Sequence, residues 1–96
     1  MRREGTRIVL CGPVTLANAA RTLEEGYAQI REGAAAVDLA EVTELDSSLL
    51  ALLLAWLREA RRLGRGLEFA NLPPGLATIA RAYGVVDLLP SAQAHH

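Results

Sequence analysis

One long apolar helix near the middle of the chain constrains the fold more than any other feature. From Leu49 to Leu57 all nine residues are apolar, and the pattern turns charged only at Arg58. Because a membrane-spanning helix needs about 20 apolar residues, this run predicts a buried helix of a globular domain. Asp46-Ser47-Ser48 before the run supplies side chains that cap helix N-termini, and Gly64 after it is typical of a helix end. We therefore predict a helix over 47–63.

The apolar residues of this helix occupy more than one of its faces. Five of them recur at helical spacing and should pack against a sheet: Leu49, Leu53, Trp56, Leu57 and Ala60. Leu50, Leu52 and Leu54 lie outside that stripe. They form either the margin of a wide buried stripe or an exposed apolar patch for a partner. In the second interpretation Leu50, Leu54 and Arg58 belong to a partner-binding helix, and its arginines form a polar rim.

Strand and helix patterns alternate along the rest of the chain. In order, we expect a strand at 7–11, a helix opening at Thr15 and ended by Gly33, a strand at 35–39, the helix at 47–63, a strand at 67–70, and a helix opening at Pro74 and ended by Gly84. Gly12-Pro13 is a turn signal that should close the first strand. This order predicts an α/β fold with a small, mostly parallel or mixed sheet and crossover helices. We expect a single domain at 1–90, closed by a short segment at 85–90, and a disordered polar tail at 91–96.

Composition argues against several classes of function. The 96 residues, 51% of them apolar, suit one domain with its own core. A net charge of −1 argues against nucleic-acid binding, which needs a basic surface. No signal peptide is visible, so we expect a cytoplasmic protein. Cys11, the single cysteine, is expected to be a buried and inert thiol.

The chain carries little of what catalysis requires. Its two histidines are His95 and His96, so a histidine-based triad or metal site has no member within the predicted domain. No glycine-rich phosphate loop follows a predicted strand, since Gly12-Pro13 does not match one. We therefore expect a protein that is not an enzyme and that uses no metal or cofactor. Its function should lie in a contact surface.

Several short motifs, taken in order, resemble the STAS domain family over about residues 8–90. They are Val37-Asp38-Leu39, then Leu45-Asp46-Ser47-Ser48 opening the leucine-rich helix, Gly64-Arg65-Gly66-Leu67, and Ala82-Tyr83-Gly84-Val85-Val86-Asp87-Leu88-Leu89-Pro90. Within the family the chain is most similar to the MlaB type, the small STAS subunits of Mla-type phospholipid-transporting ABC complexes. It is also similar to the anti-sigma factor antagonists of the SpoIIAA type.

The resemblance implies alternative functions. An MlaB-type protein binds and supports the cytoplasmic ATPase of an ABC complex that maintains outer-membrane lipid asymmetry. It would lie at the inner membrane through its partner, without inserting into the bilayer itself. A SpoIIAA-type protein is regulated by an anti-sigma factor serine kinase, and Ser47 is then the position phosphorylated. Those antagonists usually have a glycine after the two serines, whereas this chain has Leu49. A stand-alone ligand-binding STAS module is a third alternative.

Asp46, Ser47 and Ser48 are therefore the candidate site, with two interpretations that are compatible with each other. Either Asp46 or Ser47 caps the helix, its side-chain oxygen accepting a free backbone N–H. The hydroxyls can also contact a partner or carry a phosphate, which a helix N-terminus attracts. Glu41 and Glu44 lie close in sequence and would oppose a phosphate. Phosphorylation should therefore repel an acidic or apolar partner surface more than it orders the domain.

Overall fold

The computed structural model of the protein describes residues 1–85. The closing segment expected at 85–90 lies outside this range from residue 86 onward, as does the polar tail expected at 91–96. Seven elements follow one another along the described residues: β1 (Arg2–Glu4), β2 (Arg7–Val14), α1 (Ala19–Arg31), β3 (Ala36–Leu45), α2 (Ser47–Arg62), β4 (Glu68–Ala70) and α3 (Pro74–Ala82).

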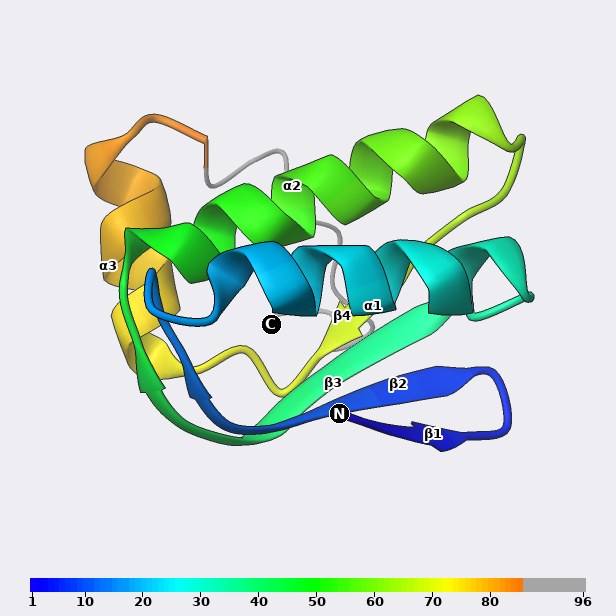
Figure 1. The fold of residues 1–96 in the computed structure, drawn as a ribbon. Helices are drawn as coiled ribbons and strands as arrows, with labels where there is room; N and C mark the ends of the chain where they lie inside the picture. The colour runs from blue at the N-terminus through cyan, green and yellow to red at the C-terminus, as the bar shows by residue number, and fades with distance from the viewer. Residues whose placement is uncertain (86–96) are drawn as a thin grey trace.

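The four strands of the described chain form one mixed sheet in the order β1-β2-β3-β4. Strand β2 runs parallel to β3, and β3 runs parallel to β4, whereas β1 pairs antiparallel with β2. Helices α1 and α2 are the crossovers between the parallel strands. Figure 1 shows them side by side over one face of the sheet, with α3 beside the start of α2. This arrangement confirms the predicted α/β fold with a mixed sheet and crossover helices.

The core lies between the sheet and these helices, and Trp56 is its largest fully buried side chain. All five α2 residues predicted to face the sheet are buried, as expected. The Trp56 Nε1–H donates to the Leu23 carbonyl of α1 at 3.1 Å. Its ring also lies against Gly26 of α1, where the Cβ of any larger residue would overlap the indole. Glycine is costly within a helix, and here its lack of a side chain lets α1 and α2 approach closely.

Ion pairs cover the opposite face of the sheet. Arg2 of β1 pairs with Glu41 of β3 at 2.8 Å, and Arg7 of β2 pairs with Asp38 of β3 at 3.2 Å. Asp38 is the one charged residue of the described chain that is buried. The Asn71 amide donates to it at 2.9 Å, and this hydrogen bond is the largest cause that lowers the pKa of Asp38. The layer joins β1 and β2 to β3 and anchors the turn after β4.

The first strands differ from the sequence prediction. Strand β1 is not among the predicted elements, and its three residues pair with 7–9 of β2. Strand β2 continues through Gly12 and Pro13 to Val14, so the turn predicted there is wrong. The two residues instead lie where the register with β3 is irregular, and Gly12 adopts φ 76°. Glycine and proline inside a strand commonly mark such bulges.

The prediction that Cys11 is buried is also wrong, because its side chain is exposed. Successive strand residues point to opposite faces, so Cys11 faces away from the core side occupied by Leu10. Backbone pairing with β1 ends at Val9, so no β1 residue pairs with Cys11. The Arg2 guanidinium reaches the sulfur at 3.8 Å.

Candidate functional site

The predicted cap of α2 is present, and Asp46 supplies it. Its Oδ1 accepts the Ser48 backbone N–H at 2.8 Å, while Oδ2 accepts the Leu16 backbone N–H at 3.0 Å. Both bonds favour the charged carboxylate and hold the pKa of Asp46 below its ordinary value, the Leu16 bond being the larger cause. One side chain therefore caps α2 and fixes the loop before α1 against it.

The two serines differ in their surroundings. Ser47 is exposed at the first position of α2, and its hydroxyl makes no hydrogen bond to any residue in the range 1–85. Ser48 is partly buried and faces α1. Because Asp46 is the cap, the Ser47 hydroxyl remains available to a partner or to a modifying enzyme. The sequence alone left Asp46 and Ser47 as equal candidates for the cap.

An apolar groove begins at Ser48 and runs between the two long helices. It encloses about 490 Å³ and is lined by Leu16, Ala19, Ala20, Leu23, Ser48, Ala51, Leu52 and Ala55. Both helices contribute alanines to the groove, and these short side chains leave the space between the helices open. Leu16 stands at its edge with 79% of its surface exposed, the most exposed large apolar residue of the described chain. The groove is therefore an uncovered apolar surface with one hydroxyl at its polar end.

The sequence analysis missed Leu16 because it placed that residue within a helix opening at Thr15. The helix begins at Ala19 instead, and residues 15–18 form a turn in which the Asn18 N–H donates to the Thr15 carbonyl at 3.1 Å. The turn carries Leu16 out of the helix and toward the start of α2. Leucine beside Thr15 and Asn18, both frequent in turns, is the one local signal that could have indicated it.

The exposed ridge of α2 consists of Ser47, Ala51, Leu54, Arg58 and Arg61. Their spacing of four, three, four and three residues places them on one stripe of the helix, and each is exposed or partly exposed. The expectation that Leu54 and Arg58 belong to an accessible surface of α2 agrees with this exposure. The same expectation is wrong for Leu50, because its side chain is buried and only 2% exposed. Leu52, at 4%, is likewise buried. Leu50 and Leu52 therefore belong to a wide buried stripe of α2 and not to an exposed apolar patch.

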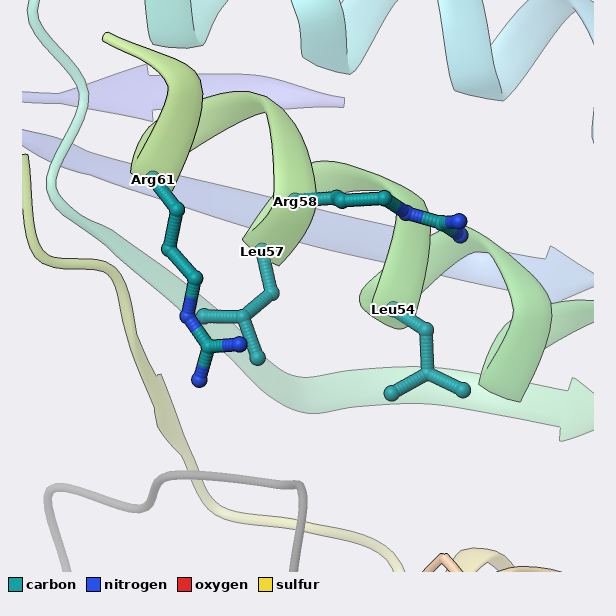
Figure 2. A pocket seen from close by; sticks show the side chains of 4 residues that line it. All are labelled: Leu54, Leu57, Arg58 and Arg61. Carbon is teal, nitrogen blue, oxygen red and sulfur yellow. The ribbon is translucent and has the colours of Figure 1, made fainter. Parts of the chain in front are cut away.

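A second hollow lies on the other side of this ridge from the groove. It holds about 280 Å³ and is lined by Leu54, Leu57, Arg58 and Arg61. Figure 2 shows Leu54, Leu57 and Arg61 pointing to the same side of α2, while Arg58 extends along the helix. Within residues 1–85 neither arginine forms an ion pair. The hollow thus combines an apolar floor with two uncompensated guanidinium groups.

The groove side of the same helix has its charges neutralised. Glu59 accepts from Arg62 at 2.7 Å and from Arg31 of α1 at 3.2 Å. These hydrogen bonds, the one from Arg62 first, lower the pKa of Glu59 from 4.5 to about 2. Positive charge on α2 is therefore concentrated on the side of the second hollow.

None of the helices within the described residues is long and apolar enough to cross a membrane. No cluster of three or more His, Cys, Asp or Glu side chains in that range is placed to hold a metal ion.

The described chain is thus a small α/β domain with a mixed sheet, crossover helices and an open apolar groove at the start of α2. The family profile described as "Mlab, STAS domain" matches residues 1–90, so the chain belongs to the STAS domain family. Domains of this family mediate protein–protein interactions and are generally non-catalytic. No curated protein matches the sequence.

Solved structures with the same fold include the anti-sigma factor antagonist SpoIIAA in its unphosphorylated form. Its TM-score is 0.67 at 19% identity, over 92% of this chain and 79% of that one. The phosphorylated form of SpoIIAA, the Bacillus cell fate determinant, has a TM-score of 0.63 at 19% identity, over 92% and 82%. A sulfate transporter family protein from Wolinella succinogenes has a TM-score of 0.63 at 16% identity, over 93% and 75%. At these identities the similarity shows the fold alone.

Proposed function

We propose that this protein is the non-catalytic STAS subunit of a phospholipid-transporting ABC complex of the Mla type. It would bind the cytoplasmic ATPase of that complex and support its assembled, active form, and so contribute to outer-membrane lipid asymmetry. The observation that carries the proposal is the uncovered apolar groove between α1 and α2, with exposed Leu16 and the two serines at one end. The match to the Mlab profile supports this branch of the family.

The chemistry of the groove favours a protein partner over a small molecule. Its volume falls within the range of ligand pockets, but such pockets combine apolar walls with several converging polar groups. Among residues 1–85, Ser48 is the single polar residue that lines this groove. A helix or loop of the partner with a large apolar side chain could fill the groove above the alanines and cover Leu16. Ser47 and the exposed ridge of α2 would then lie at the edge of the contact. Burial of apolar surface would supply most of the affinity.

In this proposal the protein works without catalysis, metal or cofactor, in the cytoplasm, and reaches the inner membrane only through its partner. Ser47, Ser48 and Asp46 form the polar end of the contact, with Leu54 and Arg58 farther along the same ridge of α2. Asp46 acts by position, because it holds both Leu16 and the first turn of α2 in place.

One observation favours a second candidate, an anti-sigma factor antagonist regulated by a serine kinase. The Ser47 hydroxyl is exposed and makes no hydrogen bond to another described residue, so it is accessible to a kinase. A phosphate there would adjoin Asp46 and bring about −1.5 to −2 charges to the rim of an apolar groove. Such a charge would release a partner that has to desolvate this surface.

Affinity purification from native membranes tests the proposal. We expect the ATPase subunit to co-purify with the tagged parent protein and to be lost from Leu16→Glu, which puts a charge at the groove without touching the core. Thr78→Glu, an exposed change on α3, is the matched control and should retain the ATPase. Recovery of a serine kinase and no transporter subunit would replace the proposal with the second candidate.

A further inference from the structure

The hollow on the far side of the α2 ridge has a chemistry that the groove lacks. Arg58 and Arg61 are one helical turn apart, both are exposed, and neither has a carboxylate partner among the described residues. Four other arginines of the same range do have one: Arg2, Arg7, Arg31 and Arg62. Within residues 1–85, Arg58 and Arg61 therefore place two unpaired positive charges one helical turn apart, directly beside Leu54 and Leu57.

The size of the hollow limits what can occupy it. At about 280 Å³ it lies just below the range typical of small-molecule pockets. An aliphatic or aromatic side chain of a partner could rest on Leu54 and Leu57, while carboxylates on either side of it meet the two guanidinium groups. Arginine suits this role because its planar donors match the oxygens of a carboxylate.

We propose that Arg58, Arg61, Leu54 and Leu57 form a docking site for an acidic helix of a protein partner that carries one apolar anchor residue between its carboxylates. The inference rests on the proposed function, since it assigns a partner chemistry to one end of the same contact ridge. The groove takes the apolar part of the partner surface, and this hollow selects for negative charge.

A membrane surface fits the same hollow less well. Recognition of anionic lipid surfaces usually needs a cluster of four to eight basic residues, each contributing about 1 kcal/mol. Here the charge comes from Arg58 and Arg61, with Arg65 next along the chain and Arg62 already held by Glu59. The protein as a whole also has a net charge of −1. Two or three arginines over a small apolar hollow suit a short acidic helix better than a bilayer.

The test is fluorescence anisotropy with the full chain and a capped, labelled helical peptide of about 15 residues. The peptide carries one leucine with glutamates one turn before and one turn after it. Its binding should weaken about two- to thirtyfold when the glutamates are replaced by glutamine, as two partly exposed ion pairs predict. The Arg58→Glu/Arg61→Glu variant should lose the acidic peptide and gain a peptide with lysines in place of the glutamates. Arg81→Glu, an exposed arginine of α3 outside the hollow, is the matched control and should bind like the parent.

Several results would overturn the inference. They are equal affinity for the glutamate and glutamine peptides, unchanged affinity in the double variant, or binding to vesicles with anionic lipids together with no binding to the acidic peptide. If the double charge reversal lowers folding stability, Arg58→Gln/Arg61→Gln removes the two positive charges without adding negative ones. This variant should also lose the acidic peptide. The assay needs no ATPase, so its failure leaves the co-purification result standing. Loss of the ATPase interaction would equally leave the peptide result in place.

Discussion

The Asp46 carboxylate accepts the Leu16 backbone N–H at 3.0 Å, across 30 residues of sequence, while its other oxygen caps α2 at Ser48. A single side chain thus holds together the exposed leucine and the serine-bearing first turn of α2. Either bond alone would fix one segment. Together they fix the position of Leu16 relative to Ser47 and Ser48, and so define the mouth of the groove.

We expect Asp46→Ala to damage both stability and binding. The N-cap and the hydrogen bond to Leu16 each contribute to stability, so their loss together should lower the thermal midpoint by about 8–16 °C. Partner affinity should fall further than stability explains, because the Leu16 loop is released. Asp46→Asn keeps one acceptor oxygen and should lie between parent and alanine variant. Circular dichroism melts together with titration of the partner measure the two effects, and equal affinity of folded Asp46→Ala and parent would contradict the role of Asp46 in positioning the loop.

Gly26 should resist substitution even by alanine. Alanine improves helix propensity by about 1 kcal/mol, but its Cβ would overlap the buried Trp56 ring. Overpacking of this kind costs about 1–3 kcal/mol, so we expect Gly26→Ala to be destabilising in denaturant titrations. Gly66→Ala is the control, because nothing lies within 4 Å of a Cβ at that position. In a double-mutant cycle Trp56→Phe should relieve part of the Gly26→Ala penalty, and strict additivity would argue against the overlap.

Acid should selectively weaken the Glu59 ion pairs. The folded pKa of Glu59 is about 2 and its ordinary value is 4.5, so its contribution to stability is complete above pH 4.5 and is lost as pH falls toward 2. Urea titrations of parent and Glu59→Gln should therefore differ most at neutral pH, and the difference should shrink below about pH 4.5 and vanish only as pH approaches 2. Glu25→Gln, which changes an exposed carboxylate without an arginine partner among residues 1–85, is the matched control and should differ little from the parent. A Glu59→Gln difference that does not change with pH would contradict the assignment of these ion pairs.

Local patterns predicted the central helix well, because its determinants lie within it. The apolar run from Leu49, the cap at Asp46 and the glycine at Gly64 all act within a few residues, and α2 ends at Arg62, one residue before the predicted end. The positions of Leu50 and Leu52 depend instead on neighbouring helices. Both flanks of α2 are packed, by α1 and by α3. Periodicity within one helix does not report how many neighbours cover it.

The errors at the N-terminus have the same origin. Gly12-Pro13 favours a turn locally, but pairing with β3 keeps both residues in a strand. Their effect is limited to an irregular register between β2 and β3. Leu16 fits the apolar spacing of a helix, yet a carboxylate 30 residues away holds its backbone outside α1. The sequence could single out the serines of the candidate site because their motif is local. The groove beside them could not be predicted in this way, because it requires two helices to be placed side by side.

Ser47→Asp separates the cap from the contact. Because Asp46 is the cap and Ser47 is exposed with no hydrogen bond to another described residue, the new carboxylate removes no interaction of the fold. Negative charge in the first turn of a helix is favourable, although Asp46 lies next to it. We therefore expect a thermal midpoint close to that of the parent.

Partner binding should respond to the same change strongly. A carboxylate at position 47 adds charge beside Asp46 on a surface that must lose its water in the complex, and an unpaired charge buried in an interface costs several kcal/mol. Affinity should fall about a hundredfold or more, whereas Ser47→Ala, which adds no charge, should lose much less. Calorimetric titration of the purified partner into parent, Ser47→Ala and Ser47→Asp measures this directly. Equal affinity of Ser47→Asp and parent would remove Ser47 from the contact surface and leave the groove and Leu16 to carry it.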